Sequence, residues 1–182
     1  MFRFLFLGNL MEEKGILVLL DACSELKQRG KHFMCTFVGA AKDVALHEMK
    51  EHVKQRRLED CVMIYGPAYG EEKAKILEEV DALVFPTFYH NECFPFVILE
   101  AMQQALPVIS TSEGAIPDMV IHEQTGILVE RRNVSALSSA MLWLIDNPHL
   151  AKEMGKAGKD LYNQSFTEER FIDTVYHILE NA

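Results

Sequence analysis

Short apolar runs alternate along the chain with longer segments whose apolar residues recur at helical spacing. Most of the short runs lack alternating polar positions, which is typical of strands covered on both faces. They span residues 2–7, 33–38, 62–65, 82–85, 108–111 and 127–129. This order predicts strands that alternate with helices, as in βα units on a parallel sheet.

The longer segments predict helices between and after these strands. One apolar stripe ends at Gly30, a common stop signal for a helix. Its members are Ile16, Leu19, Leu20, Cys23 and Leu26. Further helices are expected at 43–56, 71–79, 95–105, 134–146, 149–162 and 168–181. The last begins near Ser165 and Glu168, which have the spacing of a capping box.

The pattern as a whole predicts one α/β domain over residues 1–182. Its expected fold is a Rossmann-like, doubly wound parallel sheet of about six strands with carboxyl-terminal helices. No internal repeat or linker interrupts the chain. The six strands therefore belong to a single sheet in this interpretation.

Composition narrows the function classes. The 18 basic and 27 acidic residues give a formal charge of −9, which argues against binding to nucleic acid or anionic lipid. No apolar stretch approaches the roughly 18 residues of a membrane span, and the apolar run at 2–7 is too short for a secretion signal. The four cysteines form no CxxC pair, so we expect reduced thiols, no metal site and a cytoplasmic protein.

The segment that follows the fourth predicted strand carries the clearest chemistry. It crosses a polar loop and enters an apolar helix at Pro95, which suits a first helical position. The N–H groups of Phe96 and Val97 then point out of the helix start, where the dipole is positive. Because ligands bind beyond the carboxyl ends of parallel strands, this loop predicts an anion site.

Two glutamates bracket this helix start. Glu92 precedes it, and Glu100 lies about five residues inside, roughly 7–8 Å further along the axis. Glu100 stands among apolar residues, where an unpaired carboxylate is costly to bury, so ribose hydroxyls are a fitting partner. The alternatives are a Glu100 paired with a surface lysine, a solvated Glu92 and a solvent-exposed Lys14.

The seven residues between Glu92 and Glu100 give a spacing that resembles the E-x7-E signature of retaining GT-B glycosyltransferases. The family is glycosyl transferases group 1 (family 4 type). Other segments resemble it in order and spacing: Gly8-Asn9-Leu10, Lys14-Gly15, Val38-Gly39, and residues 80–87, 107–109, 113–118 and 125–129.

The resemblance implies that residues 1–182 form the nucleotide-sugar-binding domain, the carboxyl-terminal half of a GT-B enzyme whose amino-terminal acceptor domain is absent from this chain. It implies that Glu92 touches the donor sugar and Lys14 neutralises the diphosphate, where a leaving nucleoside diphosphate gathers charge. These two residues are the catalytic candidates.

The resemblance also implies a set of donor-binding residues. Glu100 would hold the ribose, amides of the helix start would hold diphosphate oxygens, and a loop near residue 114 would lie beside the sugar. The donor-binding candidates are Glu100, Phe96, Val97, Gly8, Asn9 and Gly114.

Two residues depart from the family pattern, and the lack of one motif bears on metal binding. Asn9 stands where the family usually has an arginine, so a cation expected at the diphosphate is missing. Pro95 replaces a more usual glycine. No Asp-x-Asp motif occurs, which indicates that the donor is bound without a metal ion and that the nucleotide sugar is a substrate with no further cofactor.

We therefore expect the full-length protein to be a hexosyl-type glycosyltransferase acting on an acceptor glycan, lipid or small molecule, and this chain alone to be inactive. A membrane-peripheral position of the full-length protein stays open. Two alternatives remain: a non-catalytic nucleotide- or partner-binding module on the same scaffold, which Asn9 favours, or a GT-B sugar-nucleotide epimerase.

Overall fold

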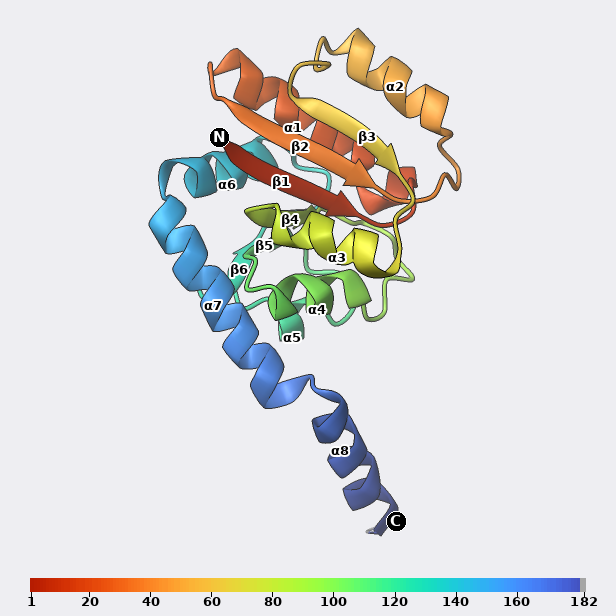
Figure 1. Ribbon diagram of the computed structural model, residues 1–182, viewed down its shortest axis with the longest axis vertical. Coiled ribbons are helices and arrows are strands. Elements are labelled where there is room, and N and C mark those ends of the chain that lie inside the picture. Colours follow the sequence, from red (N-terminus) through yellow and green to blue (C-terminus); the bar gives the residue numbers. More distant parts are fainter. Residues whose placement is uncertain (181–182) are drawn as a thin grey trace.

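A computed structural model describes residues 1–180 (Figure 1). Its six strands are all parallel and form one sheet in the order β3-β2-β1-β4-β5-β6. The strands are β1 (Phe2–Leu7), β2 (Phe33–Val38), β3 (Val62–Gly66), β4 (Ala82–Phe85), β5 (Val108–Ser110) and β6 (Gly126–Leu128). Each bound lies within one residue of its predicted run, and the predicted fold class is confirmed.

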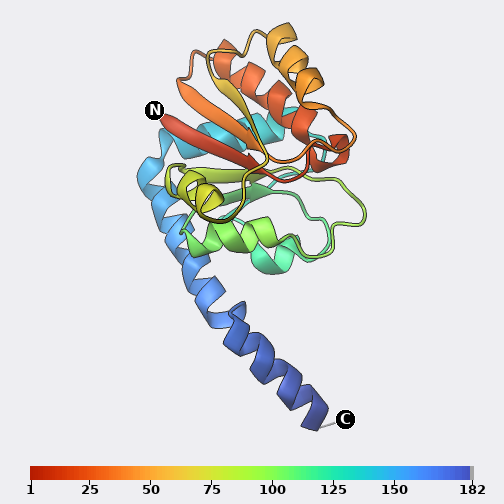
Figure 2. The same ribbon diagram turned by 45° about the vertical axis from the view of Figure 1, so that its right-hand side comes forward.

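Helices cover both faces of the sheet (Figure 2). One face carries α1 (Ile16–Gln28), α2 (Leu46–Gln55) and α6 (Val134–Asp146). The other carries α3 (Gly70–Glu78), α4 (Phe96–Gln103) and the short α5 (Ile116–Met119). A one-turn helix, η1 (Glu12–Lys14), precedes α1. Neither η1 nor α5 was predicted from the sequence, because each is too short to show a helical period.

Two long helices end the described chain. α7 (Pro148–Ser165) contacts both α6 and α4, whereas α8 (Glu168–Glu180) extends away from the body in both views (Figures 1 and 2). No residue of α8 is buried. Within residues 1–180, no helix is both long enough and apolar enough to cross a bilayer.

The centre of the sheet is a row of aromatic side chains. Phe6 of β1 lies opposite Phe37 of β2, with 5.5 Å between ring centroids, and 6.0 Å from the ring of Phe85 on β4. All three side chains are at most 1% exposed. Because helices cover both faces, these strands bury most of their side chains and read as nearly continuous apolar runs.

The start of α2 differs from the prediction. The helix begins at Leu46, three residues after the expected start at Asp43. Ala45 is extended (φ −74°, ψ 154°), and its N–H donates to the Glu48 carboxylate over 2.7 Å. The Asp43 carboxylate instead accepts the backbone N–H of Glu12 at 3.3 Å. Asp43 therefore ties the loop to η1, a long-range contact that the local pattern does not reveal.

The predicted cap of the last helix was wrong by two residues. Ser165 is the final residue of α7, and the hydroxyl of Thr167 accepts the N–H of Arg170 at 3.3 Å. Thr167 therefore caps α8, because its hydroxyl reaches the third amide of that helix. The predicted helix 168–181 is confirmed through Glu180, and its final residue lies outside the described chain.

Three of the four cysteines are buried, and all four are free. Burial raises the pKa of the Cys61 thiol to about 12. Burial raises the pKa of Cys23 as well, and a hydrogen bond with Cys35 adds to the rise. The thiols of Cys23 and Cys61 therefore stay protonated near neutral pH and serve as packing groups. Cys93 is the exposed one.

Truncation of Leu19 in the core and of Phe171 on α8 compares how much each region contributes to stability. Leu19 is 0% exposed and Phe171 is 70% exposed. We expect Leu19→Ala to lower the free energy of unfolding by about 2–5 kcal/mol, because it leaves a cavity between α1 and the sheet. Phe171→Ala should change it by less than about 0.5 kcal/mol. Urea-induced unfolding measures both, and equal losses would contradict the unpacked position of α8.

Candidate functional site

All predicted site residues lie beyond the carboxyl ends of β1, β4 and β5. β1 and β4 are neighbours, yet the helices that follow them, α1 and α4, cover opposite faces of the sheet (Figure 1). Strand order reverses between them, and the region beyond the strand ends at such a reversal is where ligands of parallel sheets bind. We call this region the crevice. The residues following these strands are Gly8, Asn9, Lys14, Glu92, Phe96, Val97, Glu100 and Gly114.

Lys14 and Glu92 meet in a mostly buried ion pair. The Lys14 ammonium lies 2.7 Å from Glu92 Oε2, and the two side chains are 16% and 8% exposed. The hydroxyl of Thr87 donates to the same carboxylate oxygen at 3.2 Å. Lys14 Nζ also lies 5.1 Å from the ring centroid of Phe85 and 5.6 Å from that of Tyr89. The alternatives of a solvated Glu92 and an exposed Lys14 are therefore wrong.

Backbone contacts between the two loops place Lys14 in this pair. Gly15 adopts φ 81°, and a Cβ there would meet the carbonyl oxygen of Pro86 at 2.1 Å. The N–H of Phe88 donates to the carbonyl of Glu13 at 2.8 Å. Only glycine permits so close an approach of the loop after β1 to the loop after β4. The short helix η1 is thereby held with Lys14 toward Glu92.

A third loop supports Glu92 from the side of β5. Gly114 adopts φ 52°, and a Cβ there would lie 1.7 Å from the carbonyl oxygen of Glu92. The N–H of Ala115 donates to the carbonyl of Cys93 at 2.9 Å. The structure therefore brings Gly114, a predicted donor-binding residue, into direct backbone contact with Glu92.

All the remaining candidates except Phe96, which is 72% exposed, border a pocket of about 140 Å³ between the ends of β1 and β2 and the helices α3 and α4. Four predicted residues line it together with a lysine that the sequence analysis missed. Its lining is Leu7, Gly8, Asn9, Val38, Gly39, Ala40, Pro67, Ala68, Tyr69, Lys73, Val97 and Glu100. We call this the Glu100 pocket.

Lys73 donates to Oε1 of Glu100 across this pocket. The side chains are 28% and 29% exposed. Glu100 thus has a charged partner among its apolar neighbours. This is the alternative in which Glu100 pairs with a lysine. The local sequence pattern does not reveal this contact, because 27 residues separate Lys73 from Glu100.

The start of α4 is one residue later than predicted. Pro95 is extended (φ −75°, ψ 105°) and caps the helix, so Phe96 takes the first helical position. The Pro95 carbonyl accepts the N–H of Ile98 at 3.0 Å. The amides of Phe96 and Val97 precede that first helical bond, so they point out of the helix start as expected. Val97 borders the Glu100 pocket.

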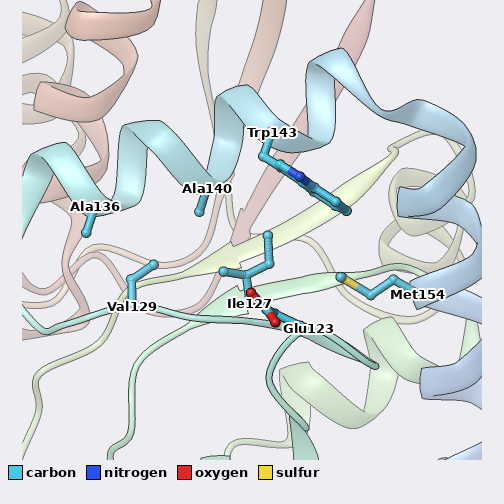
Figure 3. A pocket seen from close by; sticks show the side chains of 7 residues that line it. All are labelled: Glu123, Ile127, Val129, Ala136, Ala140, Trp143 and Met154. Atoms are coloured by element: carbon cyan, nitrogen blue, oxygen red, sulfur yellow. The ribbon is translucent and has the colours of Figure 1, made fainter.

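A larger pocket lies elsewhere, at the β6 edge of the sheet between α6 and α7 (Figure 3). It measures about 430 Å³ and is mainly apolar. Figure 3 shows Trp143, Ile127 and Met154 around it, with Glu123 as the single charged side chain. None of the predicted site residues lines it. Over residues 1–180, no three His, Cys, Asp or Glu side chains gather closely enough to hold a metal ion.

Comparison with known proteins identifies the family. The family model described as "Glycosyl transferases group 1" matches residues 2–161. The chain belongs to this family. Among curated group 1 relatives, the amylovoran biosynthesis glycosyltransferase AmsK of Erwinia amylovora is 33% identical over 146 residues, covering 78% of this chain and 35% of AmsK. The chain spans about a third to a half of the length of the curated relatives it matches.

Solved structures share the fold. Anabaena Alr3699/HepE, solved in complex with UDP, superposes with a TM-score of 0.89 at 19% identity, covering 100% of this chain and 49% of HepE. HepE has also been solved with UDP-glucose. The carboxyl-terminal domain of a group 1 family protein, LpcC of Francisella tularensis, superposes with a TM-score of 0.80 at 24% identity, covering 92% of this chain and 87% of that domain.

Alanine at Gly114 tests the contact between the loop after β5 and Glu92. Gly30 is a matched control, since it also has a positive φ, 70°, but no atom lies within 4 Å of the position that its Cβ would take. We expect Gly30→Ala to lower the free energy of unfolding by about 1–2 kcal/mol through backbone strain alone. Gly114→Ala should lower it by about 2–4 kcal/mol, because the clash with Glu92 adds to the strain. Equal losses in urea unfolding would argue against the close approach.

Proposed function

We propose that this chain is the nucleotide-sugar-binding, carboxyl-terminal domain of a retaining, metal-independent GT-B glycosyltransferase. In the full-length protein it would bind the donor from which a hexosyl-type sugar passes to an acceptor glycan, lipid or small molecule. One observation carries the proposal. The buried Lys14–Glu92 pair lies at the crevice between β1 and β4, at the carboxyl ends of the strands.

An ion pair so well buried is a poor stabilising device, because the desolvation of two charges offsets much of their attraction. It is well suited to exchange partners with a charged ligand. A diphosphate can take the ammonium protons of Lys14, and the Glu92 carboxylate can then accept hydroxyls of the donor sugar. As the bond to the sugar breaks, Lys14 would stabilise the charge that gathers on the leaving diphosphate.

The Glu100 pocket supports the nucleoside part of the proposal. It adjoins the start of α4, so a ribose on Glu100 leaves the attached phosphates close to the amides of Phe96 and Val97. HepE, which has this fold, binds UDP and UDP-glucose. The E-x7-E spacing of Glu92 and Glu100 supports the retaining outcome, and the absence of Asp-x-Asp from the sequence supports donor binding without metal.

The likeness to the separately solved LpcC domain supports the assignment of residues 1–182 as one donor-binding domain. In this proposal the acceptor site belongs to an amino-terminal domain, and the protein acts in the cytoplasm, where nucleotide sugars are the donors at hand. The alternative is a nucleotide- or partner-binding module without catalysis, and the experiments below distinguish it from this proposal.

Replacing the two glutamates by glutamine separates their roles. Glu100→Gln should weaken the binding of UDP and of UDP-glucose equally, by roughly 1.5–3 kcal/mol. Both ligands contain the ribose, and the variant loses a hydrogen bond to a charged group. Glu92→Gln should weaken UDP-glucose alone, because Glu92 faces the sugar. It should not weaken UDP, since Lys14 no longer has to leave Glu92. Isothermal titration calorimetry measures all four affinities.

Circular dichroism and the emission of Trp143, the single tryptophan, serve as fold controls for both variants. If neither nucleotide binds, the same titrations are repeated with GDP, ADP and their glucose conjugates. Equal losses of both ligands in Glu92→Gln, or no loss in Glu100→Gln, would show that the assigned roles are wrong.

The chain by itself should transfer no sugar. The residues of the crevice can bind the donor, but in this proposal the acceptor site lies on another domain. We expect the purified chain to bind UDP-glucose and to give no glycosylated product with glycan or lipid acceptors, measured by mass spectrometry. Robust product formation by the chain alone would overturn the assignment of one half of an enzyme.

A further inference from the structure

The Glu100 pocket is small compared with usual ligand pockets. Its volume is about 140 Å³, whereas ligand pockets usually measure about 300–1,000 Å³. Lys73 and Tyr69, at the start of α3, are the largest polar side chains that line it. Lys73 and Tyr69 therefore border the space beside Glu100 that a nucleoside would take.

Lys73 occupies the carboxylate that the ribose needs. Its ammonium donates to Oε1 of Glu100. Two neighbouring ribose hydroxyls would engage both oxygens of a carboxylate, so Lys73 must give up this contact when a nucleotide binds. The move is feasible because the lysine side chain is flexible and 28% exposed.

The charges around the pocket indicate where the ammonium goes. Among the described residues that line it, Lys73 is the single cation and Glu100 the single anion. Asn9, which also lines it, is uncharged. Val97 at the start of α4 lines the same pocket as Lys73, and the free amides of a helix start favour an anion.

We propose that Lys73 is a nucleotide-binding residue that exchanges Glu100 for the nucleotide's phosphate, so that it closes the pocket when empty and clamps the ligand when bound. This inference rests on the proposed function and extends it to a residue outside the E-x7-E motif. It also assigns a cation to the phosphate in a chain with Asn9 beside the pocket.

The exchange favours the bound state. An ion pair between partly exposed groups contributes little, because solvent screens it. A lysine that donates to a phosphate makes a charge-assisted hydrogen bond, which is among the stronger ones. Removing Lys73 therefore costs more affinity through the lost phosphate contact than it restores by freeing Glu100.

The test uses calorimetric titration with whichever of UDP, GDP and ADP binds the unmodified chain most tightly. Lys73→Met, which keeps the length and removes the charge, should weaken binding about tenfold at low salt. The loss should shrink to about threefold at high salt, where phosphate contacts are screened. Lys73→Arg should bind within about threefold of the unmodified chain, because it restores a cation.

Lys75→Met is the matched control, since Lys75 lies on the same helix, is exposed and does not line the pocket. It changes the net charge equally and should leave the affinity within about twofold. Unchanged binding in Lys73→Met, or an equal loss in Lys73→Arg, would overturn the role of Lys73 while leaving the proposed function intact. If the unmodified chain binds none of the three nucleotides, the proposed function fails and this inference with it.

Discussion

The constraint on which this structure depends is a parallel sheet buried on both faces. Phe6, Phe37 and Phe85 fill its centre, and helices cover the sheet on each side. The charged side chains of the site gather where strands end, and the strand order reverses there between β1 and β4. The site is consequently a property of the topology, and the sequence fills it with charge.

Close backbone contacts then convert this edge into a defined geometry. The loop after β1 touches the loop after β4 at Gly15, and the loop after β5 touches Glu92 at Gly114. Each contact excludes a Cβ atom, so three loops far apart in sequence are fixed directly to one another. Lys14 and Glu92 meet because their backbones are held, and the ion pair follows from that placement.

The sequence was a good guide where structure follows local pattern. Short apolar runs located all six strands to within one residue, because strands covered on both faces consist mostly of apolar residues. It failed at Asp43, where a distant partner decides: this residue was predicted to begin a helix but lies outside it, and its carboxylate accepts the N–H of Glu12. Two other helix starts differ for local reasons. Thr167 caps α8 in place of Ser165. Pro95 became a cap, because its extended ψ places it before the helix.

The same distinction applies to the site. The spacing of Glu92 and Glu100 is visible in the sequence. Of the two lysines that pair with them, Lys14 was a predicted site residue and Lys73 was not. Lys14 stands beside a glycine in a recognisable loop, whereas Lys73 is one of several charged residues on α3 and becomes distinctive only when α3 packs beside α4. A polar contact between helices on one face depends on how the sheet orders them.

Charge balance connects these observations. The chain carries a net charge of −9, which repels a nucleoside diphosphate at long range, so binding requires cations within the crevice itself. Each of the two glutamates pairs with one lysine, so the charges of each pair cancel. A diphosphate ligand with hydroxyl groups on either side can replace both pairings at once: its phosphates take the lysines and its hydroxyls take the carboxylates. Each of these four charges then has a partner both before and after binding, which avoids the penalty of leaving the buried ones unpaired.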